Sequence, residues 1–151
     1  MKALTIFIPV YNTEKYIKRC LDSLIVSEIM DDIEILVVND GGKDHSVEII
    51  QKYVDSYPET VRLIDKENGG HGSTINAGIK EAKGKYFRVL DSDDWLSIKF
   101  VEKFSKLMEW TDEKPEMVFT LPWVFDSVTN RILSWKDQET VSYTHLTLPT
   151  N

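Results

Sequence analysis

The sequence has one cysteine and no long apolar run, and each scarcity excludes a class of protein. Cys20 alone cannot form an internal disulfide or supply a cysteine metal cluster, so a reducing compartment is expected. No apolar stretch approaches the roughly 18–20 residues that a membrane-spanning helix needs. The run at residues 4–8 is too short for the core of a signal peptide. We therefore expect a cytoplasmic protein, with the inner face of the membrane as the alternative location.

Basic residues are also in the minority. Eighteen Lys and Arg stand against 25 Asp and Glu, which gives a net charge of −7. A nucleic-acid-binding protein needs a basic surface to displace counterions, so this class is excluded. An acidic chain that binds a phosphate-bearing substrate needs a metal ion or the N–H groups of a helix start. The 42% of hydrophobic residues are typical of a soluble globular domain.

Short apolar runs alternate with amphipathic stretches along the chain. The runs predict strands at residues 4–8, 33–38, 61–64, 86–90 and 117–121. Helical spacing predicts helices at residues 13–25, with Thr13 as N-cap, at 44–57 and at 73–82, and a fourth striped by Phe100 and Phe104. Connections this short allow only right-handed βαβ crossovers. The predicted fold is α/β, with a mainly parallel sheet flanked by helices.

Polar and glycine-rich clusters lie in the loops that follow these strands, at residues 9–13, 39–44, 67–72 and 91–95. In parallel α/β sheets, ligands bind at the carboxyl ends of the strands, where the strand order switches direction. The four loops therefore form the predicted site.

The loop after the fourth strand carries the acidic run Asp91-Ser92-Asp93-Asp94. Alternate residues of an extended segment project to the same side, so Asp91 and Asp93 are predicted to converge on one ligand. Mg²⁺ and Mn²⁺ bind carboxylate oxygens together with substrate phosphates, and paired carboxylates are usually kept where a positive group lies between them. The alternative is that these acids only cap the next helix. For Asp94, the capping role and the metal-site role are equally good interpretations.

Two other loops carry polar groups suited to a nucleotide. Asp40, in Asn39-Asp40-Gly41-Gly42, is placed to accept a hydrogen bond from a nucleobase or a ribose; the alternative is an ordinary Asp-Gly turn. Residues 67–74 combine glycines, hydroxyls and a helix start, which can cradle an anion; the alternative is a flexible connector. His71 and Asn76 are placed to face the same ligand. Cys20 is expected in the core, and Trp95 is the tryptophan nearest the acidic run.

The loops carry four motifs in order along the chain. They are Ile8-Pro9-Val10-Tyr11-Asn12, Val37-Val38-Asn39-Asp40-Gly41, Asn68-Gly69-Gly70 with Asn76-Ala77-Gly78-Ile79, and Leu90-Asp91-Ser92-Asp93-Asp94-Trp95. Together they resemble the family 2 glycosyltransferases of the GT-A fold, over residues 3–121. The resemblance implies transfer of a sugar, with inversion, from a nucleotide-diphosphate sugar such as a UDP sugar to a glycan or lipid-linked acceptor. Its expected setting is cell-surface polysaccharide synthesis.

The resemblance also implies roles for particular residues. Pro9, Tyr11 and Glu14 would line the nucleotide pocket, and Asp40 would contact the base. Asp91 and Ser92 would bind the ribose end of the donor, and Asp91 and Asp93 would hold Mn²⁺ or Mg²⁺ on the diphosphate. Many members have an Arg where Ile75 stands, so Gly70, His71 and Asn76 would make the phosphate contacts instead. Many also have Ser-Thr-Asp where this chain has Gly42-Lys43-Asp44.

The C-terminal part departs further from the family. A hairpin-like turn is predicted at residues 125–130, but neither Asp126 nor Asp137 stands in the context of the family's general base. Residues 141–151 resemble translated sequencing-adapter read-through, with a genuine edge strand as the alternative, so His145 is excluded from any site. We expect residues 1–140 to be an incomplete, donor-binding domain, truncated at the C-terminus and lacking the base.

Two other functions fit parts of the pattern. A nucleotidyltransferase that makes nucleotide sugars shares the α/β plan and the metal. It is disfavoured because Pro9-Val10-Tyr11-Asn12 stands where that class carries a basic, glycine-rich loop. The other alternative is a non-catalytic α/β binding module.

Overall fold

The structure is a computed structural model that describes residues 2–97, 124–126 and 131–133. The chain divides into two units, residues 1–110 and 111–151, and each is described by itself. The predicted helix that carries Phe100, the predicted strand at residues 117–121, Asp137 and the tail at 141–151 lie outside the described residues.

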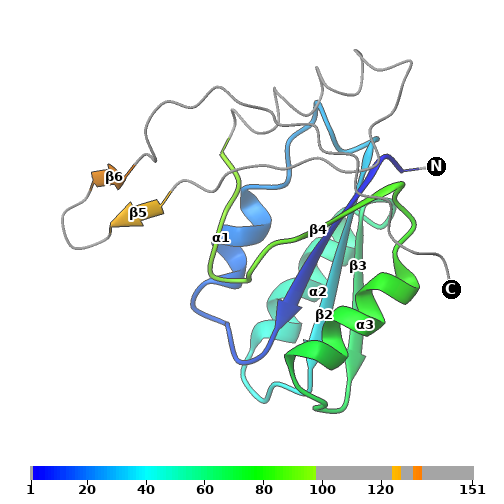
Figure 1. The fold of residues 1–151 in the computed structure, drawn as a ribbon, viewed down its shortest axis with the longest axis vertical. Helices are drawn as coiled ribbons and strands as arrows, with labels where there is room; N and C mark the ends of the chain where they lie inside the picture. The colour runs from blue at the N-terminus through cyan, green and yellow to red at the C-terminus, as the bar shows by residue number, and fades with distance from the viewer. Residues whose placement is uncertain (1, 98–123, 127–130, 134–151) are drawn as a thin grey trace, which may run out of the picture. The chain divides into compact units, whose positions relative to one another are not determined.

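The first unit is built on four parallel strands. They are β1 (Leu4–Val10), β2 (Ile33–Asp40), β3 (Val61–Lys66) and β4 (Tyr86–Val89). Their order is β3-β2-β1-β4, with every pairing parallel (Figure 1). The chain moves outward from β1 to β3 and then returns to pair β4 with the other side of β1. The strand order therefore switches direction between β1 and β4, which is where α/β sheets bind ligands.

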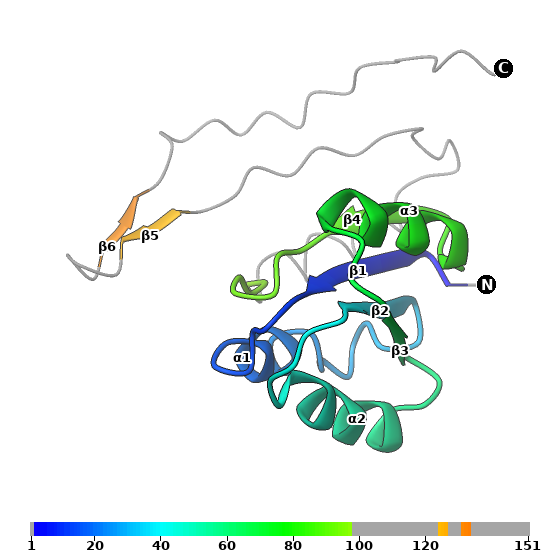
Figure 2. The same ribbon diagram turned by 90° about the horizontal axis from the view of Figure 1, so that it is seen from below.

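Three helices cover both faces of this sheet. Figure 2 shows α1 (Ile17–Asp22) and α2 (Ser46–Ser56) on one face and α3 (His71–Glu81) on the other. Because alternate strand residues point to opposite faces, the core divides in two. Ile6 and Ile35 belong to the cluster that also contains residues of α1 and α2, whereas Phe7 and Leu36 pack with residues of α3. The α/β fold class predicted from the sequence is confirmed.

Helix α3 approaches the sheet most closely at Gly78. A Cβ atom on this residue would lie 2.4 Å from the ring of Phe7, so only a glycine fits while the ring keeps its place. The ring of Phe7 also stacks on Phe87 of β4, with ring centroids 5.4 Å apart. The glycine of the third motif thus fixes α3 against β1.

Glu34 is a buried charged residue within β2, only 3% exposed. Its carboxylate accepts hydrogen bonds from the Thr5 hydroxyl at 2.7 Å, from the Lys83 amide at 2.8 Å and from the Arg62 guanidinium. Burial alone would raise the pKa of Glu34, but the Lys83 amide, the Thr5 hydroxyl and the Arg62 guanidinium together lower it. Glu34 therefore joins the connection between α3 and β4 to the sheet, with its carboxylate hydrogen-bonded within the chain.

Several boundaries differ from the prediction. Strand β2 runs to Asp40 instead of ending at Val38, because Asn39 and Asp40 pair with Asp65 and Lys66 of a longer β3. The interpretation of Asn39-Asp40 as turn residues was therefore wrong, although Gly41 does begin the loop. Helix α3 begins at residue 71 and strand β1 extends to residue 10.

The first helix is shorter than predicted, with six residues, and Thr13 is not its N-cap. Tyr16 holds that position without a side-chain capping bond. The Thr13 amide instead donates to the Ser46 hydroxyl at 3.0 Å, which joins the first loop to the start of α2. Helical periodicity cannot distinguish a true first turn from a turn whose amides are held by another element.

The second unit contains a short antiparallel pair, β5 (Val124–Asp126) and β6 (Arg131–Leu133). This confirms the predicted hairpin, whose turn residues lie outside the described part of the chain. None of the helices among the described residues is long and apolar enough to cross a membrane.

Candidate functional site

All four predicted loops leave the sheet at the same edge, because all four strands are parallel. The loops after β1 and β4 flank the switch in strand order, and those after β2 and β3 lie beside them. At the end of β1, Pro9 is half-buried within the strand, and the Tyr11 side chain is 54% exposed. Two of the three residues assigned to the nucleotide pocket, Pro9 and Tyr11, therefore lie at this edge, with the tyrosine side chain accessible.

The first and second loops are joined by hydrogen bonds. Asn12, with a φ of 53°, accepts a hydrogen bond on Oδ1 from the Lys43 amide at 2.8 Å. Two further bonds form a reciprocal pair: the Glu14 amide donates to Asp44 Oδ2 at 2.8 Å, and the His45 amide donates to Glu14 Oε2 at 3.0 Å. The carboxylate of Glu14, assigned to the nucleotide pocket, thus lies at the start of α2.

Gly42 occupies a tight position in this junction, where many family members have Ser. A Cβ atom there would lie 3.0 Å from both the Asn12 amide nitrogen and Asn39 Oδ1. Asn39 Oδ1 also accepts a bond of 3.4 Å from the Gly42 amide, while its Nδ2 donates to Asp65 at 2.8 Å. The departure from the family pattern accompanies a close approach of the first and second loops.

Asp40, at the end of β2, is 4% exposed and heavily hydrogen-bonded. Its Oδ1 accepts from the Lys66 ammonium and from the Gly69 amide at 2.9 Å, and its Oδ2 accepts from the Gly70 amide at 2.8 Å. The bond from Lys66 has the largest effect on the pKa of Asp40; with the two amides it outweighs burial and lowers that pKa. Asp40 therefore stays ionised and joins the second loop to the third.

The third loop is bound to the second and not an unattached connector. Gly41 has a φ of +68°, and a Cβ on it would lie 2.8 Å from the Asn68 amide nitrogen, so the two backbones are in direct contact. Gly70 has a φ of +82° and is the N-cap of α3. A Cβ at Gly70 or Gly72 would meet nothing within 4 Å. The start of α3 thus borders open space, as an anion cradle requires.

The polar residues at the start of α3 differ in exposure. His71 is the first helical residue and is exposed; its carbonyl accepts a bond of 2.5 Å from the Thr74 hydroxyl. Asn76 is exposed one turn further along, whereas Thr74 is buried. His71 is therefore accessible at the same end of α3 as Gly70, and Asn76 is accessible in the middle of the helix.

The acidic run forms a turn and not an extended segment. The Asp94 amide donates to the Asp91 carbonyl at 3.0 Å, so Ser92 and Asp93 occupy the two central positions of the turn. The expectation that Asp91 and Asp93 lie on one side of an extended chain was therefore wrong in its geometry. Both side chains are nevertheless exposed, while Ser92 is buried, with an exposed fraction of 6%.

The carboxylates of this turn are close enough to affect each other. Burial, followed by the charges of Asp93 and Asp91, raises the pKa of Asp94. Within the described residues, none of the ion pairs formed involves these three carboxylates. No group of three or more His, Cys, Asp or Glu in that part of the chain is arranged to hold a metal. A cation here would therefore need further ligands from a substrate.

Helix α1 holds the acidic turn from behind. The Cys20 thiol donates to the Asp91 carbonyl at 3.8 Å, and the Leu96 amide donates to the Ser23 hydroxyl at 3.1 Å. The guanidinium carbon of Arg19 lies 3.5 Å from the centroid of the Trp95 ring. Cys20 is fully buried, as predicted, and burial followed by the three carboxylates raises its pKa to about 12.

Two residues at this edge were missed from the sequence. Lys66 pairs with Asp40 across the β2–β3 register, and opposite charges at the ends of two adjacent strands could have indicated the pair. Arg19 was not identified, because nothing in the local sequence connects it to a tryptophan 76 positions later.

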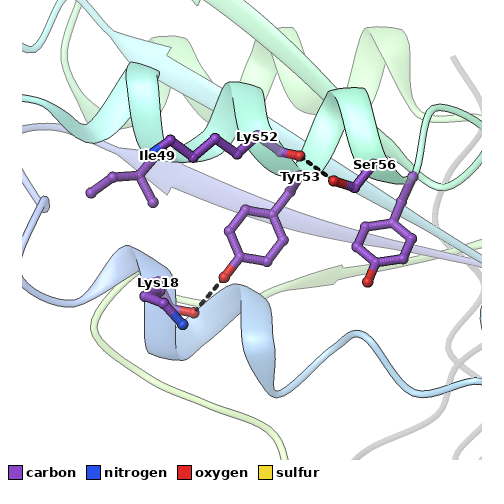
Figure 3. A pocket seen from close by; sticks show the side chains of 6 residues that line it. Lys18, Ile49, Lys52, Tyr53 and Ser56 are labelled. Carbon is purple, nitrogen blue, oxygen red and sulfur yellow. Dashed lines mark hydrogen bonds between the residues drawn. The ribbon is translucent and has the colours of Figure 1, made fainter.

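A groove of about 320 Å³ lies elsewhere, between α1 and α2. Figure 3 shows its lining residues, with the Tyr53 hydroxyl directed to the backbone of Lys18; the others are Ile49, Lys52, Ser56 and Tyr57. None of them belongs to the four loops, so this groove is not part of the candidate site.

A doubly covered parallel sheet with an acidic turn at its switch point defines a GT-A, Rossmann-like nucleotide-binding fold. The family model described as "Glycosyl transferase family 2" matches residues 5–142. The chain belongs to this family.

Three known proteins show the likeness. The chain is 38% identical over 108 residues to "Glycosyltransferase GlyA" of Streptococcus pneumoniae and 42% identical over 99 residues to "Chondroitin synthase" of Pasteurella multocida. These matches cover 71% and 66% of this chain. The crystal structure of S. aureus TarS 1–349 in complex with UDP-GlcNAc is similar with a TM-score of 0.62 and 28% identity, over 72% of this chain.

The chain spans only part of these proteins: 15% of GlyA, 10% of the chondroitin synthase and 31% of the TarS chain. The match to the family model, over residues 5–142, contains all four loops.

Proposed function

We propose that this chain is the donor-binding part of a glycosyltransferase that transfers a sugar from a nucleotide-diphosphate sugar. The observation that carries the proposal is the meeting of four motif-bearing loops at the switch point of the sheet. Family membership supports the reaction class, and the TarS structure bound to UDP-GlcNAc supports a UDP sugar as the donor. The named synthases among its relatives support a role in polysaccharide synthesis.

In this proposal the first two loops bind the nucleoside. Pro9 and Tyr11 line the pocket from the end of β1, and Glu14 completes it from the start of α2. Asp40 contacts the base. A carboxylate offers about four acceptor positions, and Asp40 uses three of them within the chain, so Oδ2 can still accept from a base N–H.

The third and fourth loops bind the diphosphate and the ribose. Gly70 and His71 lie at the accessible start of α3, where backbone N–H groups favour an anion, and the exposed Asn76 is assigned to the same ligand. Ser92 and Asp91 bind the ribose side of the donor. This arrangement gives an acidic chain the local positive potential that a phosphate ligand needs.

Asp91 and Asp93 would hold Mn²⁺ or Mg²⁺. Their chemistry fits such an ion, because both are exposed carboxylates in one turn with no ion pair among the described residues. Two protein carboxylates suffice when diphosphate oxygens and water complete the coordination. A divalent ion there would stabilise the negative charge that develops on the leaving nucleoside diphosphate.

The acceptor half of the reaction is assigned outside the described site. We propose that the general base lies outside the described residues and that a glycan or lipid-linked hydroxyl attacks the donor with inversion. We place the protein in the cytoplasm, at or near the inner face of the membrane, where nucleotide sugars are available; the single buried thiol of Cys20 is consistent with a reducing compartment.

Calorimetry with UDP, with and without Mn²⁺, tests the proposal. We expect binding that requires Mn²⁺, is lost in Asp93→Ala and is kept in Asp31→Ala, an exposed carboxylate outside the four loops. Tighter binding of UTP than of UDP would instead favour a nucleotidyltransferase. If the wild type bound neither nucleotide, a non-catalytic module would be the better interpretation.

A further inference from the structure

The ends of β2 and β3 place a lysine and an aspartate side by side. Lys66 is the register partner of Asp40, and each is the last residue of its strand. The side chains are 23% and 6% exposed, so the ion pair is largely shielded from water. A pair shielded in this way holds its geometry better than a pair on the surface.

The ammonium of Lys66 lies beneath the third loop. Besides Asp40, it donates to the Glu67 carbonyl at 2.6 Å. A Cβ atom on Gly69 would lie 3.2 Å from Lys66 Nζ, so the loop backbone passes directly over the ammonium. Lys66 therefore contacts the start of the loop itself and reaches its end through Asp40.

Asp40 completes the connection to the end of the loop. Its two oxygens receive the consecutive amides of Gly69 and Gly70, and the second of these residues is the N-cap of α3. The direction of the first amides of α3 depends on the backbone of this cap. A change in the orientation of Asp40 would therefore change what the start of α3 presents to the open space beside Gly70 and Gly72.

We propose that Lys66 is a positioning residue of the donor site. It holds the Asp40 carboxylate, and through it the loop at residues 67–70, in the conformation that presents Gly70 and the start of α3 to the donor diphosphate. This inference rests on the proposed function for the identity of the ligand. The loop conformation itself is a property of the chain without ligand.

A double-mutant cycle tests whether Lys66 acts through Asp40. Calorimetry with UDP and Mn²⁺ is carried out on the wild type, Lys66→Met, Asp40→Asn and the double variant. Lys66→Met should weaken UDP binding about tenfold, the loss expected for one charge-assisted hydrogen bond. The double variant should bind within about threefold of the weaker single variant, because residues that act as one unit are not additive.

Two further variants control for charge and for folding. Lys66→Arg keeps a cation and should recover most of the affinity. Lys80→Met removes an exposed lysine from the last turn of α3 and should leave the affinity unchanged. If the effects of Lys66→Met and Asp40→Asn multiplied in the double variant, Lys66 would act on the donor directly and the proposal would be wrong. No effect of Lys66→Met would overturn it as well.

Hydrogen exchange separates this inference from the proposed function. In Lys66→Met, the Gly69 and Gly70 amides should lose protection while the amides of β1 and β2 keep theirs. Unchanged exchange at the two glycines would show that Lys66 does not fix the loop. Failure of the wild type to bind UDP would instead overturn the proposed function and the role of Lys66 in donor binding. Hydrogen exchange would still decide whether Lys66 fixes the loop.

Discussion

The carboxylates at the two sides of the site lie in opposite environments. Asp40 is buried, accepts three hydrogen bonds and has a lowered pKa. Asp91, Asp93 and Asp94 are exposed and form no ion pair among the described residues, and burial followed by the charges of Asp93 and Asp91 raises the pKa of Asp94. What holds the acidic turn is its backbone, through the Asp91 carbonyl and the Leu96 amide, and not its carboxylates.

This difference separates two uses of the same chemical group. A carboxylate whose bonds are satisfied within the chain stabilises the folded state and orders the backbone around it. Exposed carboxylates without an ion pair among the described residues are available for an external cation. Both kinds lie at one edge of one sheet, so substitutions on the two sides should have separable effects on stability and on binding.

The largest expected effect is on stabilisation by ligand. With UDP and Mn²⁺ at 100 times the dissociation constant, the wild type should gain about 2.7 kcal/mol in free energy of unfolding. The double variant Asp91→Asn and Asp93→Asn should lose this gain, because it removes the proposed metal ligands. Urea denaturation with and without ligand measures both.

The same variant provides its own control in the absence of ligand. Its free energy of unfolding should stay within about 0.5 kcal/mol of the wild type, because neither carboxylate has an ion-pair partner among the described residues. A large loss of stability without ligand would show that the acidic turn has a structural role. The proposed difference between the acidic turn and Asp40 would then be wrong.

Asp40→Ala, unlike the acidic-turn variant, should lower stability even without ligand. It removes the partner of Lys66 and leaves the amides of Gly69 and Gly70 unpaired, so the free energy of unfolding should fall by about 2 kcal/mol without any ligand. Urea denaturation at pH 7 measures the change. Asp31→Ala is the matched control and should change stability by less than about 0.5 kcal/mol. Equal stability of the two variants would contradict the assignment of Asp40 as a structural carboxylate.

The lowered pKa of Asp40 predicts a particular pH dependence. Its stabilising effect is fully present above the unfolded-state pKa of about 3.9 and is lost as pH falls through the lower folded-state value. The stability difference between the wild type and Asp40→Asn should therefore be largest near neutral pH and should narrow in acid. Denaturation curves between neutral pH and the acid range measure this, and a constant difference would mean that ionisation of Asp40 contributes nothing.

The smallest expected effect concerns the packing behind the acidic turn. Arg19→Met removes the cation over Trp95 and should lower the free energy of unfolding by about 0.5–1 kcal/mol, the usual strength of such a contact at an exposed site. Lys15→Met, an exposed charge just before α1, is the control and should have no measurable effect. A loss of stability as large as that of Asp40→Ala would show that side-chain contacts hold the acidic turn, and the contrast with Asp40 would be wrong.

Much of the fold could be predicted because apolar runs and helical spacing are local properties. All four strands of the sheet and its three helices were identified, and the parallel arrangement followed from the short connections. The location of the site followed from the same reasoning, since all parallel strands end at one edge. The boundaries at Asp40 and Lys66 were missed because polar residues can extend a strand when a neighbouring strand pairs with them.

The site could be located but not constructed from the sequence. Asp40 was identified, but its bonds to Gly69 and Gly70 depend on a contact between two loops that no local pattern encodes. The turn at Asp91 was expected to be extended, because a spacing of two residues carries no information about a bond between Asp94 and Asp91. Residue types could be predicted, whereas partners far apart in the chain could not.

The buried thiol behind the acidic turn also offers a native labelling site. Cys20 is the only cysteine of the chain, so a thiol reagent would report on this one position without competition. Its pKa of about 12 leaves almost no thiolate at neutral pH while the thiol is buried against the Asp91 carbonyl. The alkylation rate of Cys20 therefore measures how often the contact between α1 and Asp91 opens. A ligand that binds the acidic turn should lower this rate.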